Sequence, residues 1–178
     1  MEVPELYPYV MLSAGAITFQ CIIIGVLAGG KRGKLFDHEK LKEKFGDEHQ
    51  KNFKTDPPKE GYPDHGDGRY AEDLSYMNWY QFSLDQRSHK NFLEQLTITV
   101  YLLLVIGLVY PIAALVFAGI HFVFRIVYVI GYRTGSTNQT FGANARGFGG
   151  IVINPAILVM CIMAVVGLCV WVSEIPKI

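Results

Sequence analysis

The stretch QLTITVYLLLVIGLVYPIAALVFAGIHFVF, residues 95–124, contains no Lys, Arg, Asp or Glu. A helix that crosses the hydrocarbon core of a bilayer needs about 20 apolar residues. With its polar flanks, this stretch is long enough for two such helices. Because proline cannot continue a helix, the Tyr110-Pro111 step predicts a tight antiparallel turn. We therefore expect one helix at about 79–109 and the next at about 112–133.

Two further uncharged blocks, residues 8–30 and 151–173, lie on either side of this pair. Each is long enough for one more membrane span. Across the chain of 178 residues, 51% are hydrophobic and 18% are charged, whereas soluble domains carry about 25% charged residues. The sequence predicts an all-α integral membrane protein, a bundle of four transmembrane helices that forms a single domain over residues 1–178.

Most of the charged residues lie in residues 31–78, between the first two predicted spans. A loop of this length in a compact bundle is usually functional or disordered. The segment 36–53 is compatible with a short surface helix interrupted at Gly46, and the Pro- and Gly-rich residues after it predict an irregular loop. Sixteen basic residues balance sixteen acidic ones, and this zero net charge argues against a nucleic-acid partner.

Four spans place both termini on one side of the membrane, together with a single basic residue, Lys177. The other fifteen basic residues lie in, or at the membrane edges of, the loops 31–78 and 134–150. The positive-inside rule then predicts that these loops face the cytosol, or the matrix in a mitochondrial inner membrane. Asn138 begins an N-x-T sequon in the second loop, and on this topology we expect it to be unmodified.

The cysteines at positions 21, 161 and 169 all lie inside predicted spans. They form no C-x-x-C pair, and the five histidines show no ligand spacing such as H-E-x-x-H. The sequence therefore predicts no metal site.

Three polar residues lie on one face at the start of the second span. Arg87, Asn91 and Glu94 follow one another at i, i+4 and i+7. An ionisable group inside a membrane indicates a functional site and is expected to have a partner. The alternative, that Arg87 and Glu94 form an ion pair at the membrane edge and hold helices in register, remains open.

The third span carries a second polar face, formed by His121, Arg125, Tyr128 and Tyr132. An aromatic belt with a snorkelling arginine is the alternative explanation of this face, but it does not explain why Arg125 lies two turns inside the span. If the two faces met, they would offer a guanidinium, an amide, a carboxylate and two phenols. Such a set suits a small zwitterionic ligand with carboxylates and an amino group.

The segments RSHKNFLE (87–94) and RIVYVIGY (125–132) resemble the paired signature of the MAPEG family, the membrane-associated proteins in eicosanoid and glutathione metabolism. Within the family they are most similar to the branch of microsomal glutathione S-transferase 3. The resemblance implies a homotrimer in the endoplasmic reticulum or a mitochondrial membrane, with glutathione bound between subunits. It implies transferase or peroxidase activity on lipophilic substrates that arrive through the bilayer. By match to the motifs, the glutathione-binding residues would be Arg87, Asn91, Glu94, Arg125, Tyr128 and Tyr132.

Catalysis requires a thiolate, and a guanidinium beside the glutathione thiol would favour that form. In well-characterised relatives an arginine follows the first tyrosine by eleven to thirteen residues, but here that window is 139–141, with the sequence QTF. The nearest arginines are Arg133 and Arg146. We therefore take Arg146, together with Tyr132, as the candidate catalytic residues.

The chain also departs from the family pattern after Glu94, where Gln95 replaces an aromatic residue and Thr97-Ile98 replaces the expected prolines. A second hypothesis follows from these departures and from the length of the 31–78 insert. The chain would then be a non-catalytic accessory subunit of a larger membrane assembly, such as a mitochondrial respiratory complex. In that case the insert would contact other proteins of a hetero-oligomeric complex.

Overall fold

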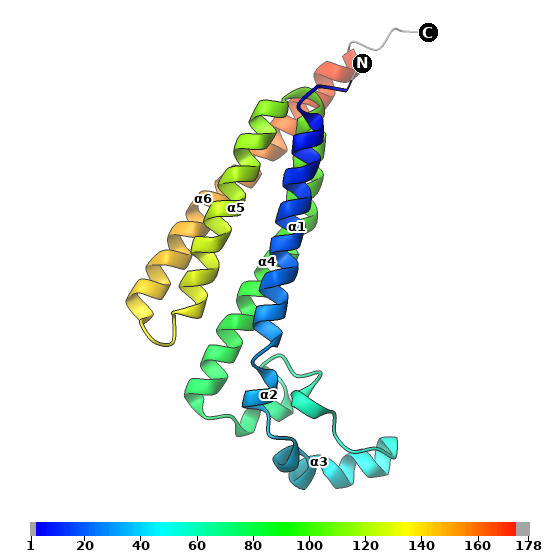
Figure 1. Ribbon diagram of the computed structural model, residues 1–178, viewed down its shortest axis with the longest axis vertical. Helices are drawn as coiled ribbons and strands as arrows, with labels where there is room; N and C mark the ends of the chain where they lie inside the picture. Colours follow the sequence, from blue (N-terminus) through cyan, green and yellow to red (C-terminus); the bar gives the residue numbers. More distant parts are fainter. Residues whose placement is uncertain (1–2, 174–178) are drawn as a thin grey trace.

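The computed structural model describes residues 3–173 and contains four long helices side by side (Figure 1). The four helices are α1 (Tyr7–Gly29), α4 (Tyr76–Val109), α5 (Pro111–Arg133) and α6 (Gln139–Ser173). Each is long and apolar enough to cross a membrane. The prediction of an all-α integral membrane protein with a four-helix bundle is confirmed.

The turn between α4 and α5 consists of one residue. Tyr110 lies between Val109 and Pro111 with φ −129° and ψ 64°, outside the helical region. Pro111 occupies the first position of α5. An N–H at this position would have no acceptor within the helix, so its absence from proline costs no hydrogen bond. The turn predicted from the Tyr110-Pro111 step is therefore present.

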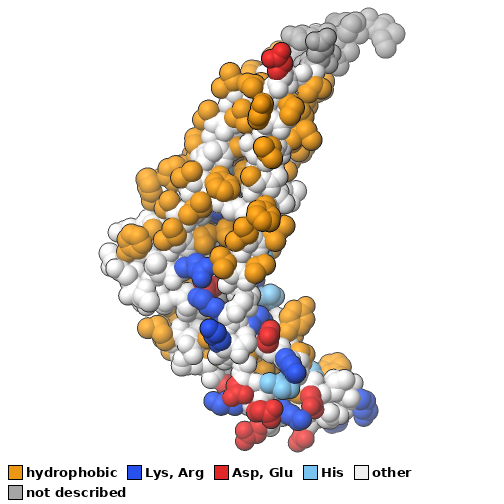
Figure 2. Space-filling view, viewed as in Figure 1, with side chains coloured by type: hydrophobic (Ala, Val, Ile, Leu, Met, Phe, Trp, Pro, Cys, Tyr) orange, Lys and Arg blue, Asp and Glu red, His pale blue; other side chains and the backbone are white. Residues whose placement is uncertain are grey.

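The pair α4 and α5 forms the centre of the bundle, with α1 on one side and α6 on the other. Phe92, Leu103, Ile106 and Met160 belong to the core that joins these helices, and they are almost fully buried. Many apolar side chains instead point outward, and Figure 2 shows them covering the bundle away from the insert. A surface of this kind is suited to hydrocarbon, because lipid tails do not penalise exposed apolar groups.

The start of α6 differs from the prediction. The helix begins at Gln139 and not at residue 151, so the expected loop 134–150 shrinks to residues 134–138. The carboxamide oxygen of Asn138 accepts a hydrogen bond from the N–H of Phe141 (3.0 Å) and satisfies one free donor of the first turn. The α4 helix likewise begins at Tyr76, three residues before the predicted start at 79.

The insert is ordered and contains four short elements. These are α2 (Arg32–Leu35), α3 (His38–Phe53), η1 (Lys59–Gly61) and η2 (Arg69–Asp73). The interruption expected at Gly46 is absent, since α3 runs through that residue. A small apolar core lies under the insert, made of Phe36, Leu41, Phe45 and Ala71 of the insert and Phe82 of α4.

Two cations hold the insert in place, one within the insert and one against the bundle. The guanidinium of Arg32 donates to the carbonyls of Glu60 (3.0 Å) and Gly61 (2.7 Å). The ammonium of Lys31 pairs with the carboxylate of Asp85 on α4, at 2.6 Å. Because Asp85 is almost fully buried, loss of Lys31 would leave a buried carboxylate without its cation, which is destabilising. The insert is therefore fixed to the foot of α1 and α4.

Asp64 holds the irregular part of the insert together, and its replacement provides a test. Its carboxylate, in a residue only 7% exposed, accepts hydrogen bonds from the N–H groups of Gly66 (2.7 Å), Gly68 (3.0 Å) and Ala71 (2.9 Å). In Asp64→Asn an amide –NH₂ must face at least one of these donors. We expect a loss of local stability of about 2 kcal/mol.

Hydrogen exchange of residues 61–73 is the measurement, because local opening exposes these amides directly. Asp67→Asn is the matched control, since that side chain is 80% exposed and lies 3.9 Å from its nearest cation. Faster exchange in Asp64→Asn alone is expected. Equal exchange rates in both variants would contradict the role given to Asp64.

Candidate functional site

Polar side chains of α4 and α5 meet inside the bundle. The carboxamide nitrogen of Asn91 donates to the phenol oxygen of Tyr128 (2.7 Å) and lies 3.2 Å from that of Tyr132. The two phenol oxygens are 3.4 Å apart. The structure thus brings together three of the residues that the two sequence stripes singled out.

Arg125 is the most deeply buried charged side chain of this group, with 1% of its surface exposed. Its guanidinium donates to the carboxamide oxygen of Gln95 and lies 4.4 Å from the ring centre of Phe92. Within residues 3–173 no carboxylate lies within ion-pairing distance, and the Nε–H has no acceptor. Burying a cation without a carboxylate partner costs free energy. An anionic ligand would offset this cost, so the position is suited to one.

A cavity of about 160 Å³ opens beside this guanidinium. Its lining comes from α4, α5 and α6, and includes Asn91, Glu94, Gln95, Arg125, Tyr128, Gly150, Ile153 and Asn154. The cavity therefore combines a cation, a carboxylate, three carboxamides and a phenol. Such a lining can hold a ligand that carries both charges.

Arg87 and Glu94 are both exposed. The side chain of Glu94 lines the cavity, whereas Arg87 does not. Among the described residues the two form no ion pair with each other, and seven residues of helix separate them by about 10 Å. The alternative in which they pair directly is therefore absent from this structure.

Arg146 comes close to the two tyrosines because α6 starts early. Its guanidinium carbon lies 5.5 Å from the ring centre of Tyr132. If residues 134–150 formed a loop, as predicted, the sequence would not define the position of Arg146 relative to the tyrosines. On the second turn of α6 it faces α5, at the end of the site marked by Tyr132.

Two residues of the site were missed from the sequence. Gln95 accepts from Arg125 and donates through its –NH₂ group to the carboxamide oxygen of Asn154 at 2.9 Å. The signal for Gln95 was its position one turn after Asn91 on the same helix. Asn154 could have been noticed as the single carboxamide of an otherwise apolar block, next to Pro155.

Within residues 3–173 no three His, Cys, Asp or Glu side chains lie close enough together to hold a metal ion. The side chains that line the cavity carry guanidinium, carboxylate, amide and phenol groups.

Comparison with known proteins identifies the family. The model of the MAPEG family matches residues 8–166, which include all of α4 and α5, most of α1 and α6, and every residue of the site. No curated protein and no solved structure matches the chain. The family match covers most of the sequence, and the chain belongs to the MAPEG family.

Proposed function

We propose that this protein is a glutathione-dependent transferase or peroxidase of the microsomal glutathione S-transferase type, acting on lipophilic substrates. The observation that carries the proposal is Arg125, a buried guanidinium with no acid among the described residues, beside a cavity that Asn91 and Tyr128 also line. Members of the family generally use glutathione, which carries two carboxylates and one ammonium group. The site offers groups of complementary charge.

Each residue has a role in this proposal. Arg125 binds a glutathione carboxylate, and Glu94 binds the ammonium group, as expected for charge-assisted hydrogen bonds. Asn91 orients Tyr128 and Tyr132 through the hydrogen bonds described above. The exposed Arg87 binds the second carboxylate at the edge of the site.

Arg146 and Tyr132 act on the thiol. A thiol with a pKa near 8.5 is only a few per cent ionised at pH 7, and a nearby guanidinium raises that fraction. In conjugation by substitution, the thiol proton goes to water, the thiolate sulfur forms a bond to an electrophilic carbon, and the leaving group on that carbon departs with its bonding electron pair. In peroxide reduction, the sulfur attacks the O–O bond and an alcohol leaves. A second glutathione then converts the sulfenic acid to the disulfide and water.

The cavity in one chain is smaller than the 300 Å³ or more that small-ligand sites usually offer. We therefore infer that a neighbouring copy completes the site in a homotrimer, as the family resemblance implies. The proposed location is the endoplasmic reticulum or a mitochondrial membrane. The insert and the 134–138 turn would face the cytosol or matrix, in keeping with the basic residues of the insert and with Arg133 and Arg146 on either side of the turn.

Turnover of glutathione by the purified protein tests the proposal, with a hydrophobic electrophile and a lipid hydroperoxide as substrates. Arg146→Ala is expected to lower the rate at pH 7 about tenfold, because loss of the guanidinium raises the thiol pKa by about one unit. The deficit should shrink as the pH rises toward 9, where the thiol ionises unaided. Arg146→Lys should retain part of the activity.

Arg69→Ala, in the exposed ion pair with Glu48 of the insert, is the matched control and should leave the rate unchanged. Absence of turnover by a folded oligomer that binds glutathione would contradict catalysis. Equal activity of Arg146→Ala and the wild type at every pH would remove Arg146 from the mechanism.

A second candidate function is that of a non-catalytic accessory subunit in a larger membrane assembly. The observation that favours it is the ordered insert, which exposes three large aromatic side chains, Phe53, Tyr62 and Tyr76. Charged side chains gather on the same part of the molecule (Figure 2). Purification from the native membrane after mild crosslinking separates the two functions. A stoichiometric unrelated chain crosslinked to residues 31–78 supports the accessory role, whereas self-crosslinks alone support the enzyme.

A further inference from the structure

An apolar groove of about 460 Å³ lies between α1 and α5, and neither the site nor the insert uses it. Its walls are formed chiefly by Phe19, Ile23 and Leu27 of α1 and by Phe122, Ile126 and Ile130 of α5. These six side chains remain between 37% and 63% exposed. The groove is therefore open to the side, toward the hydrocarbon that surrounds the bundle.

The length of the groove matches one leaflet of a bilayer. On α5 it runs from Phe122 to Arg133, a distance of about 16 Å at the rise of an α-helix. That is half of a hydrocarbon core of about 30 Å. At the deep end the carboxamide of Gln20 donates to the carbonyl of Phe122 at 2.9 Å and ties the two helices together.

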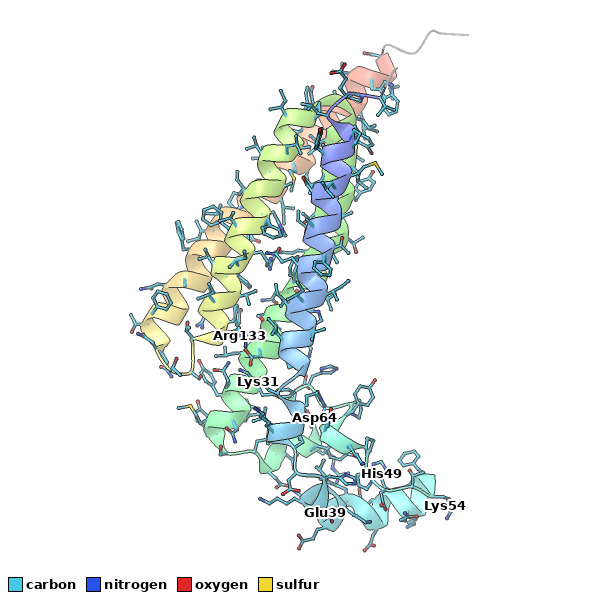
Figure 3. The ribbon with its side chains drawn as sticks, viewed as in Figure 1. Lys31, Glu39, His49, Lys54, Asp64 and Arg133 are labelled. Carbon is cyan, nitrogen blue, oxygen red and sulfur yellow. The ribbon has the colours of Figure 1, made fainter. Side chains whose placement is uncertain are left out.

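The other end of the groove carries a positive charge. Arg133 lines it there, half-buried, and its guanidinium makes no hydrogen bond or ion pair within residues 3–173. Lys31 lies at the same end of the bundle (Figure 3). The nearby Asp85 is already paired with Lys31, so no free acid offsets Arg133.

This groove is separate from the proposed glutathione site. Its α5 residues, centred on Ile126 and Val129, lie about a third of a turn around the helix from Arg125, Tyr128 and Tyr132. A ligand in the groove would not touch the phenols or the cavity beside Arg125. The groove therefore calls for a different occupant.

We propose that the groove between α1 and α5 binds one acyl chain of an anionic phospholipid from the leaflet on the insert side, with its phosphate on Arg133. The apolar walls bind the chain along one leaflet, and the bridge from Gln20 to Phe122 joins the two walls near the membrane centre. Basic residues between transmembrane helices at the membrane surface are suited to anionic headgroups. A bilayer phospholipid is the occupant because α1 and α5 are both long and apolar enough to cross a membrane, so that a groove open between them is reached from the hydrocarbon.

Photocrosslinking in phosphatidylcholine nanodiscs tests the proposal. The probes are phosphatidylserine and phosphatidylcholine, each with a diazirine in one acyl chain, added in trace amounts and mapped by peptide mass spectrometry. The expected label falls on residues 16–27 and 122–130, with more from phosphatidylserine than from phosphatidylcholine. Unlabelled phosphatidylserine should compete for it, whereas a free fatty acid at the same concentration should not.

Ile126→Trp fills the groove and should remove most of this label, whereas Val159→Trp on α6, of nearly equal exposure, should keep it. Phe19→Trp repeats the test should Ile126→Trp fail to fold. Arg133→Gln should remove the preference for phosphatidylserine, a change of about fivefold, and Arg69→Gln in the insert should retain it. Label spread evenly over the four helices, or equal from both headgroups, would show only bulk lipid and overturn the proposal. Competition by the fatty acid alone would overturn it too.

Discussion

Replacing Arg125 with methionine is expected to weaken glutathione binding about a hundredfold or more, while the bundle stays folded and no less stable. The guanidinium is 1% exposed and has no carboxylate partner in the described part of the chain. The free-energy cost of removing this guanidinium from water is therefore present in the unliganded protein and is offset only when an anion binds. A methionine of similar length removes both the cost and the anion site.

The stability of Arg125→Met should stay level or rise by about 1–3 kcal/mol, as seen when buried charges are replaced by well-packed apolar side chains. Gln95 loses one partner but keeps its hydrogen bond to Asn154. Glutathione should raise the melting temperature of the wild type, since a ligand that binds only the folded state stabilises it. It should leave the melting temperature of Arg125→Met unchanged.

Melting in detergent with and without glutathione, together with calorimetric titration, measures both effects. Arg69→Met, on the insert surface, is the control and should bind glutathione as the wild type does. A large drop in the stability of Arg125→Met would mean that the guanidinium serves the fold. Unchanged affinity would remove Arg125 from the binding site.

The four spans could be predicted because membrane insertion depends on a property that is local in sequence. Runs of about 20 uncharged residues are sufficient evidence for a span, and Pro111 marks the one place where a longer run must break. The periodicity of a helix likewise predicted which side of α4 carries Asn91 and which side of α5 carries Tyr128 and Tyr132. These predictions needed no knowledge of neighbouring helices.

The rest of the site depends on how α6 packs against α5, which no local pattern reveals. Arg146 enters the site only because α6 starts at Gln139, and Asn154 reaches Gln95 because α6 packs alongside α5 and α4. The segment FGANARGFGG was predicted to lie in a loop because it precedes the uncharged block 151–173, and its glycines disfavour an isolated helix. Inside a bundle the same glycines let two backbones approach closely, and that packing outweighs their poor propensity.

The folded structure of the insert also could not be predicted from local sequence patterns. The sequence of residues 31–78 is polar, yet Phe36 packs edge to face against Phe82, which lies beyond the insert on α4, and Phe45 packs against Tyr70. The side chain of Arg32 links this core to the backbone of η1. Contacts between residues this far apart in sequence specify the structure of the insert.

Adding one methyl group to either of two glycines of α6 is expected to change stability in opposite directions. A Cβ at Gly142 would lie 2.7 Å from the carbonyl oxygen of Gly131 and 2.6 Å from the Cα of Gly135. All of these neighbours are backbone atoms, so no side chain can move aside. We expect Gly142→Ala to lower the free energy of unfolding by about 3 kcal/mol, at the upper end of the cost of overpacking.

Gly147→Ala is the matched control on the same helix, because its Cβ would meet no atom within 4 Å. There the substitution should raise stability by about 0.5–1 kcal/mol, since alanine has the higher helix propensity. Thermal melting in detergent measures both changes. Gly142→Ala should also lower glutathione turnover, because moving α6 away from α5 draws Arg146 away from Tyr132. Equal melting temperatures for the two variants would show that α5 and α6 are not packed backbone to backbone, and the placement of Arg146 in the site would then fail as well.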